Sequence, residues 1–131
     1  MTSARELLRY VGIEKPAQTL AKHLSYGEQR RLEIARGLIH DPKILFLDEP
    51  SAGLDPVTSA GLDQLILDLS RNLGITFVIV THELASIETI ADRVIMLDKE
   101  VQGIIAEGDP RQLKMQTDNQ KAYHFFNRMS S

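Results

Sequence analysis

The sequence contains no cysteine, no long hydrophobic run and no excess of positive charge, and each absence excludes a class of protein. Without cysteine, the 131-residue chain has neither a disulfide framework nor a thiolate metal site, which suits a reducing compartment. No stretch approaches the roughly 20 consecutive apolar residues that a membrane-spanning helix needs. The formal net charge of −3 predicts no general attraction to nucleic acid or to an anionic membrane. Partners must therefore be inferred from local features.

A phosphate-binding loop is also missing. The pattern G-x-x-x-x-G-K-[ST] does not occur, and none of the eight glycines is followed by lysine. The sequence therefore offers no Walker A loop to cradle the β-phosphate of a nucleotide.

The apolar residues that are present, 43% of the chain, suffice for one compact domain or a piece of one. Apolar residues at helical spacing predict helices, and unbroken apolar runs at 44–47 and 77–80 predict strands covered on both faces. Two further strands, joined by a polar turn, are predicted at 94–97 and 103–106. The alternation of strand and helix favours an α/β fold with a mostly parallel sheet. The predicted helices cover residues 4–11, 26–39, 56–73 and 84–91, with helical pieces from 110 to 128.

Two helix starts can be read from local signals. Ser25 is followed three residues later by Glu28, which is the pattern of a capping box. Asp55 precedes Pro56, so we expect Asp55 to be a helix N-cap and Pro56 to occupy the first helical position. Both segments are therefore expected to begin helices.

Polar residues directly follow the two apolar runs. In open parallel sheets, ligands bind outside the carboxyl ends of the strands, where Asp48, Glu49 and His82 stand. An apolar strand followed by Asp-Glu resembles a Walker B motif, in which the first carboxylate helps to hold Mg²⁺ and the second can orient an attacking water. Taken alone, the pair could equally be a polar start to a loop.

Four motifs that follow one another along the chain favour the Walker B interpretation of Asp48 and Glu49. The first is LSYGEQ at residues 24–29, which is similar to the LSGGQ signature. The others resemble the Walker B strand at 44–49, the D-loop at 51–55 and the switch histidine at His82. With these four motifs, the chain resembles the ATP-binding cassette (ABC) ATPase family. The resemblance covers nearly the whole length of the chain.

The resemblance implies that the cofactors are ATP and Mg²⁺. It implies that Glu49 is the general base, that His82 contacts the γ-phosphate, and that Asp48 holds Mg²⁺ through water. The signature would act on a nucleotide held by the opposite subunit. The residues expected to bind nucleotide are Ser25, Tyr26, Gly27, Glu28, Gln29, Asp48 and Asp55.

Physical chemistry supports an anion site at the signature. A helix that begins at Ser25 offers free backbone N–H groups and the positive end of its dipole, and Gly27 leaves room for an anion. The alternative is that Ser25 and Glu28 only cap their helix, although capping and anion binding are compatible. Arg30 and Arg31 are expected on a solvated, ion-paired face, and His23, His40 and His124 at the surface or at helix ends.

The fold implied by the resemblance is a partial P-loop NTPase core of the RecA-like type, with a mostly parallel sheet flanked by helices. Residues 1–40 would be the end of the helical subdomain with the signature helix. Residues 41–109 would be the C-terminal half of the nucleotide-binding core, and 110–131 a helical tail. The initial Met before a helix inside the subdomain suggests a start imposed by truncation. We expect the chain alone to lack activity, and to dimerise or be only marginally stable through its exposed sheet edge.

The implied partners are a second ABC ATPase subunit and transmembrane permease subunits, with no nucleic acid and no direct insertion into the membrane. The expected location is cytoplasmic, peripheral on the inner face of the cell membrane. Residues 81–86, 104–110 and 125–128 look like phospholipid-trafficking (Mla-type) or toluene-tolerance ATPases, whereas 24–38 looks like branched-chain amino-acid importers. A non-catalytic remnant that only docks or dimerises is the rival function. A DNA-repair or translation ATPase is disfavoured, because the sequence shows no basic patch.

Overall fold

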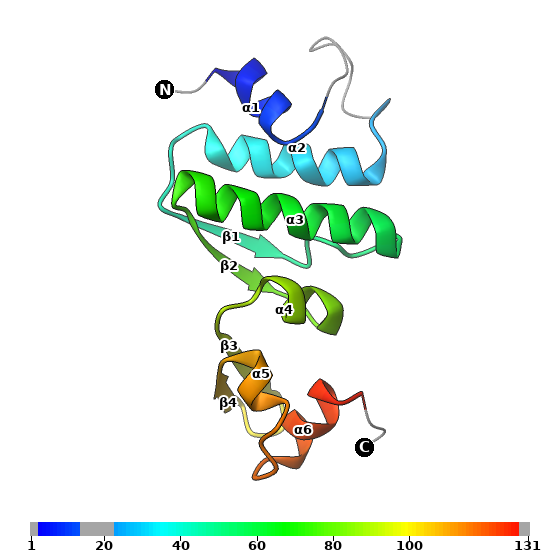
Figure 1. Cartoon of the computed structure of the whole chain (residues 1–131), viewed down its shortest axis with the longest axis vertical. Coiled ribbons are helices and arrows are strands. Elements are labelled where there is room, and N and C mark those ends of the chain that lie inside the picture. The colour runs from blue at the N-terminus through cyan, green and yellow to red at the C-terminus, as the bar shows by residue number, and fades with distance from the viewer. Residues whose placement is uncertain (1–2, 14–22, 129–131) are drawn as a thin grey trace. The chain divides into compact units, whose positions relative to one another are not determined.

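The computed structural model describes residues 3–13 and 23–128, and it divides the chain into two compact units, 1–81 and 82–131. Each unit combines helices with one two-stranded sheet (Figure 1). The division falls inside the segment 41–109 that the sequence analysis assigned to one core. The three-part domain assignment itself stays a prediction.

The first unit contains three helices and a parallel pair of strands. The helices are α1 (Ala4–Tyr10), α2 (Tyr26–Leu38) and α3 (Pro56–Leu73), and the strands are β1 (Ile44–Asp48) and β2 (Thr76–Val80). In the register of the pair, Ile44 lies opposite Thr76 and Asp48 opposite Val80. The carboxyl ends of β1 and β2 therefore lie side by side, as expected for strands joined by a crossover helix.

The core of the first unit lies among its helices. Each helix places an apolar stripe inward, as its spacing in the sequence predicts. The stripe of α3 is the longest, and Leu62 and Leu69 are almost completely inaccessible. The buried apolar residues are Leu7, Val11, Ile13, Ile34, Ala35, Leu38, Leu62, Leu65, Ile66, Leu69 and Ile75.

The expectation that both apolar strands are covered on both faces is wrong for the structure described here. Residues alternate along each strand between half-buried and exposed, and Phe46 is 74% exposed. On the covered face, Leu45 packs closely against Gly37 of α2. A Cβ atom added to Gly37 would lie only 2.7 Å from Leu45 Cδ1. The helices of this unit therefore cover one face, and the other carries apolar side chains that nothing in the unit contacts closely enough to bury.

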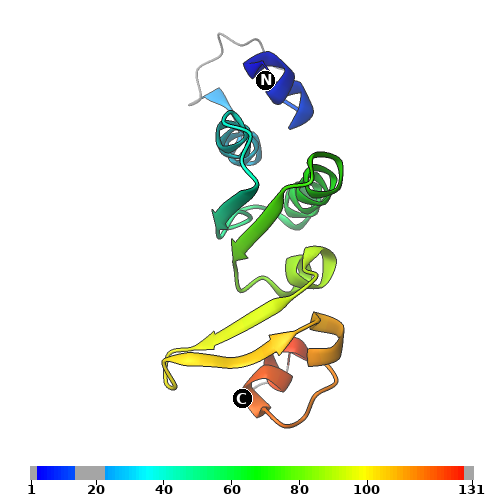
Figure 2. The ribbon, with the colours of Figure 1, turned by 90° about the vertical axis from the view of Figure 1, so that its left-hand side faces the viewer.

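The second unit packs three short helices against an antiparallel hairpin. Its helices are α4 (Leu84–Ile90), α5 (Pro110–Leu113) and α6 (Gln120–Phe126), and its strands are β3 (Val94–Asp98) and β4 (Gly103–Gly108). Figure 2 shows the two strands as a hairpin. The expected polar turn is confirmed. Parallel pairing does not extend to these strands, because the connection at 99–102 is too short for a crossover.

One apolar cluster joins the elements of the second unit. Leu84, Ile87, Leu113 and Phe126 are buried together, and residues of the hairpin pack against them. Phe126 is 1% exposed, so α6 belongs to this core. The partly buried members of the cluster are Ala91, Val94, Met96, Ala106 and Phe125.

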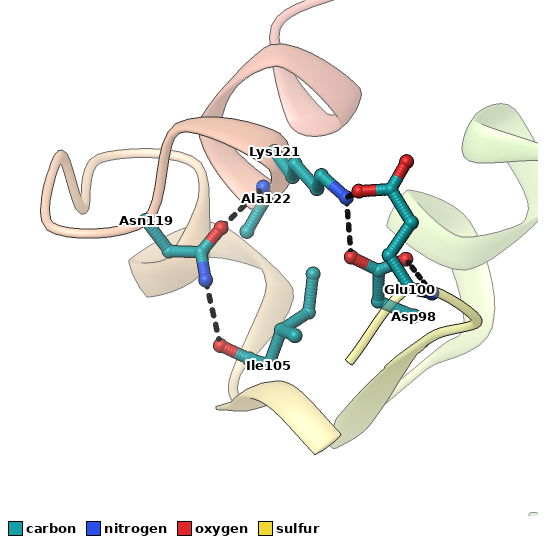
Figure 3. A network of polar contacts seen from close by, with 6 residues as sticks. All are labelled: Asp98, Glu100, Ile105, Asn119, Lys121 and Ala122. Carbon is teal, nitrogen blue, oxygen red and sulfur yellow. Dashed lines mark hydrogen bonds and ion pairs between the residues drawn. The ribbon is translucent and has the colours of Figure 1, made fainter. Parts of the chain in front are cut away.

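Polar contacts also hold α6 to the hairpin (Figure 3). The ammonium group of Lys121 lies 2.6 Å from a carboxylate oxygen of Asp98 and 2.6 Å from one of Glu100. Asn119 donates from Nδ2 to the carbonyl oxygen of Ile105 and caps α6 by accepting from Ala122 N–H. The Lys121 ammonium lowers the pKa of Asp98. These contacts fix the start of α6 beside the hairpin turn.

Candidate functional site

The end of β1 is the most strained point among the predicted site residues. Asp48 is the last residue of the strand and is exposed. Glu49 follows with φ of 46°, in the left-handed region that a residue with a Cβ atom rarely adopts. Such a conformation costs of the order of 1–3 kcal/mol and is enriched at functional sites.

Two hydrogen bonds hold Glu49 in this conformation. Its N–H donates to the carbonyl oxygen of Val80 at the end of β2, at 2.8 Å, and its carbonyl accepts from Ala52 N–H at 3.1 Å. The first bond ties the turn after β1 to the neighbouring strand. Oxygen Oε2 of the Glu49 side chain is shielded from solvent. The two carboxylates therefore differ: Asp48 is accessible, and Glu49 is partly enclosed.

The D-loop, residues 51–55, follows as a tight turn into α3. Ser51 is buried, and its carbonyl accepts from Leu54 N–H at 3.1 Å. Asp55 is the N-cap of α3, as predicted, and accepts from both the N–H and the hydroxyl of Thr58. The Thr58 hydroxyl is the main reason that the pKa of Asp55 is lowered. The carboxylate is therefore ionised and engaged in capping.

The capping box predicted at the signature is confirmed. Ser25 Oγ accepts from Glu28 N–H at 3.2 Å, and Glu28 Oε1 accepts from Ser25 N–H at 3.1 Å. Gln29 donates from Nε2 to the carbonyl of Leu24 at 3.1 Å. Three signature side chains are thus used to shape the start of α2, whereas the side chain of Tyr26 is 75% exposed.

Gly27 brings the signature and the D-loop helix together. A Cβ atom on Gly27 would lie 2.6 Å from Thr58 Cγ2, so the starts of α2 and α3 abut at this point. Close packing of two helices accounts for the absence of a side chain here, which the sequence analysis attributed to the approach of an anion. The first unit therefore places residues 25–29 beside the first turn of the helix that Asp55 caps.

His82 begins the second unit, directly after Thr81 at the end of the first. Its side chain is 76% exposed, with Nε2 at 3.7 Å from Glu83 Oε1. His82 belongs to the second unit, whereas the strand ends at Asp48 and Val80 belong to the first. The placement of His82 beside Glu49 therefore stays a prediction.

Arg31 is a residue whose role the sequence analysis missed. Arg30 forms the expected ion pair with Glu33, at 3.4 Å. Arg31 instead donates from Nη1 to the carbonyl of Val11 at 2.8 Å, and its guanidinium lies against Gly12 and Gly61. The prediction of a solvated face is wrong for Arg31, because two glycines leave room for the guanidinium between the end of α1, α2 and α3.

No membrane-spanning helix and no metal-ligand cluster occur in the part of the chain that the structure describes. Among residues 3–13 and 23–128, no three His, Cys, Asp or Glu side chains lie within reach of one metal ion, and no helix is long and apolar enough to cross a membrane. Asp48 alone at the end of β1 fits an indirect contact to Mg²⁺, since its carboxylate is exposed.

Comparison with known proteins identifies the class. The profile of the family described as ABC transporter matches residues 2–52. The high-affinity branched-chain amino acid transport ATP-binding protein LivG of Escherichia coli K12 is 37% identical over 116 residues, which are 88% of this chain and 45% of LivG. The methionine import ATP-binding protein MetN of Protochlamydia amoebophila is 36% identical, over 91% of this chain and 34% of MetN.

Solved structures agree with these sequence matches. The ADP conformation of MJ1267, an ATP-binding cassette of an ABC transporter, has a TM-score of 0.81 and 28% identity, covering 95% of this chain and 48% of that protein. The cbiO1 protein from Clostridium perfringens, part of the ABC transporter complex cbiONQ, has a TM-score of 0.74 and 28% identity, covering 92% and 51%.

The chain belongs to the ABC transporter ATP-binding family, and its fold is part of the P-loop NTPase fold of those proteins. It spans about half the length, or less, of the relatives it matches.

Proposed function

We propose that this chain is the part of an ABC transporter ATP-binding subunit that supplies the signature, Walker B, D-loop and switch-histidine residues to ATP hydrolysis. The observation that carries the proposal is the strained backbone of Glu49 at the carboxyl end of β1, beside the end of β2. This is the edge at which parallel sheets bind ligands. The residue expected to be the base therefore stands at the expected edge.

The two carboxylates after β1 have different roles in this proposal. Asp48, which is accessible, contacts Mg²⁺ through water and so helps to neutralise charge on the phosphates. Glu49 orients the attacking water and accepts its proton, and its conformation is fixed by the hydrogen bond to Val80. His82 contacts the γ-phosphate. Fixing these groups in advance is what allows a site to stabilise developing charge.

The signature residues act on the nucleotide of a second ATPase subunit. The start of α2 presents its dipole and backbone N–H groups there, and the capping box of Ser25 and Glu28 holds that start in place. Tyr26, Gly27, Gln29 and, from the D-loop, Asp55 complete the surface facing the nucleotide. The same helix start thus serves both capping and binding.

The chain as it stands is proposed to bind ATP weakly and to hydrolyse it negligibly. Phosphoryl transfer depends on the P-loop lysine and Mg²⁺ together, and the sequence has no G-x-x-x-x-G-K-[ST]. Permease subunits would attach the working assembly to the inner face of the membrane. LivG and MetN are named for different substrates, and we propose none for this chain.

A second candidate, a docking or dimerisation module without catalysis, is favoured by the missing loop alone. The substitution Glu49→Gln separates the two in an assembly completed by a P-loop-bearing segment of an ABC ATP-binding protein. If the chain is catalytic, the variant loses phosphate release and keeps its ATP-dependent association. If the chain is only a docking module, the substitution changes neither quantity.

A further inference from the structure

The guanidinium group of Arg31 links the three helices of the first unit. Figure 1 shows α2, which carries Arg31, between α1 and α3. Nitrogen Nη1 donates at 2.8 Å to the carbonyl oxygen of Val11, the C-cap residue of α1. Nitrogen Nη2 lies against Gly61 of α3, where an added Cβ atom would be only 3.3 Å away. One side chain of α2 therefore contacts both neighbouring helices.

The carbonyl group that α1 offers is suited to a cation. The last carbonyl groups of a helix have no partner within the helix, and they carry the negative end of its dipole. Val11 has no solvent-exposed surface, so water cannot replace the donor at its carbonyl. A charged donor also forms a stronger hydrogen bond than a neutral one. The bond from Arg31 is therefore a firm attachment between α2 and the end of α1.

The contact with Gly61 continues the junction between the starts of α2 and α3. Arg31 follows Gly27 by four positions on α2, and Gly61 follows Thr58 by three positions on α3. Residues at these spacings lie on the same face of a helix, one turn apart. The contacts of Gly27 with Thr58 and of Arg31 with Gly61 are therefore successive turns of one helix interface. Two such contacts fix both the rotation of α2 about its axis and its position along α3.

We infer that Arg31 is a positioning residue for the signature. Because its guanidinium contacts α1 and α3 at once, it fixes the start of α2, at Ser25, relative to the start of α3, at Asp55. Arg31 lies six positions after Ser25 and acts through the junction of Gly27 with Thr58. The inference rests on the proposed function, in which both helix starts contribute to the nucleotide site of a second subunit.

Two substitutions separate the attachment of α1 from the positioning of α2. A guanidinium carries several N–H donors in one plane, whereas lysine has a single ammonium group. Arg31→Lys should therefore keep a bond to Val11 and lose the contact with Gly61, and Arg31→Met should lose both. Arg30→Met is the matched control, because Arg30 is the adjacent arginine and forms its ion pair with Glu33 on the same helix.

Native-state hydrogen exchange of the 131-residue chain measures each helix end separately. The amide of Gln29 closes the first turn of α2 with a hydrogen bond of 2.8 Å, and that of Ser59 closes the first turn of α3 with one of 2.9 Å. The amide of Val11 reports on the end of α1, where its bond is 3.0 Å long. If Arg31 only attached α1, a substitution would change exchange at Val11 and leave the two helix starts as they are.

The expected result is a loss of protection at the helix starts. Arg31→Met should lower the protection of Gln29, Ser59 and Val11 about tenfold. Arg31→Lys should lower it at Gln29 and Ser59 and leave Val11 as in the wild type, and Arg30→Met should change none of them. Wild-type protection of Gln29 and Ser59 in Arg31→Lys would overturn the inference, and so would an equal loss in Arg30→Met. The lysine variant decides the matter if the methionine variant does not fold.

Phosphate release by the chain mixed with a P-loop-bearing segment of an ABC ATP-binding protein gives a second readout. Arg31 acts on the site only through the helix starts, so Arg31→Lys should lower kcat about tenfold and leave KM for ATP unchanged. A kcat equal to that of the wild type would overturn the positioning role. If the wild-type mixture releases no phosphate, the proposed function fails, whereas the exchange result still decides whether Arg31 fixes the helix starts.

Discussion

The close contact between Gly27 and Thr58 makes a quantitative prediction about the signature helix. In Gly27→Ala the new methyl group would lie 2.6 Å from Thr58 Cγ2, about 0.9 Å inside an ordinary carbon–carbon contact. Inserting a methyl group into a packed contact costs about 1–3 kcal/mol, whereas replacing a helical glycine by alanine gains about 0.5–1 kcal/mol. We therefore expect a net loss of about 1–2 kcal/mol in the stability of the first unit.

The side chain of Thr58 cannot turn away without a cost. Its hydroxyl and its N–H both donate to the Asp55 carboxylate at the cap of α3, so rotation about χ1 would give up the hydroxyl bond. That bond contributes about 1 kcal/mol. The clash in Gly27→Ala could thus be relieved by moving the starts of α2 and α3 apart or by rotating the side chain of Thr58. Both changes cost a similar free energy.

A double-mutant cycle tests this reasoning. Thr58→Ser removes Cγ2 and keeps the hydroxyl, so Gly27→Ala should be harmless in that background, with a coupling of about 1–2 kcal/mol. Native-state hydrogen exchange of the amides in α2 and α3 measures the loss in this unit separately from the other. The reasoning is refuted if Gly27→Ala is as stable as wild type, or if it costs the same with Ser at position 58.

Substitutions at three further positions have expected outcomes. Phe126→Ala, at a residue 1% exposed, should destabilise the second unit by about 3–5 kcal/mol and abolish exchange protection in α6; unchanged protection would contradict the assigned core. The pKa of Asp98 is lowered in the folded chain by Lys121, so this pair stabilises above the unfolded value of 3.8 and the contribution is lost as the pH falls through the folded pKa. Lys121→Met should therefore reduce the loss of thermal stability that acidification causes. A loss equal to that of the wild type in acid would refute the coupling between Lys121 and Asp98. Gly74 ends α3 with φ of 66°, so Gly74→Ala should lower the free energy of unfolding of the first unit by about 1 kcal/mol and Gly74→Asn by less. Equal free energies of unfolding, measured by chemical denaturation, would contradict the left-handed cap.

Local features of this protein were predictable from its sequence. The caps at Ser25 and Asp55 depend on side chains within three residues of the helix start, and both are found as expected. The strand positions followed from apolar runs, and the short polar connection after Asp98 carried the signal for antiparallel pairing that the general α/β pattern obscured.

Features that depend on distant partners were not predictable. Arg31 bonds to Val11, twenty positions away, only because Gly12 and Gly61 leave space for it. The strands β1 and β2 have the composition of strands covered on both faces, and composition does not show that alternate residues of each are exposed in the described structure. Gly27 belongs to a motif expected to bind an anion, but its packing against Thr58 follows from the arrangement of two helices.

The rate of phosphate release from ATP tests the central claim most directly. The chain should be measured alone and mixed with a P-loop-bearing segment of an ABC ATP-binding protein, after circular dichroism has shown that both are folded. The account predicts negligible release by either component and Mg²⁺-dependent release by the mixture. Folded components that associate but release no phosphate would contradict it, and would leave a docking module whose motifs do no chemistry.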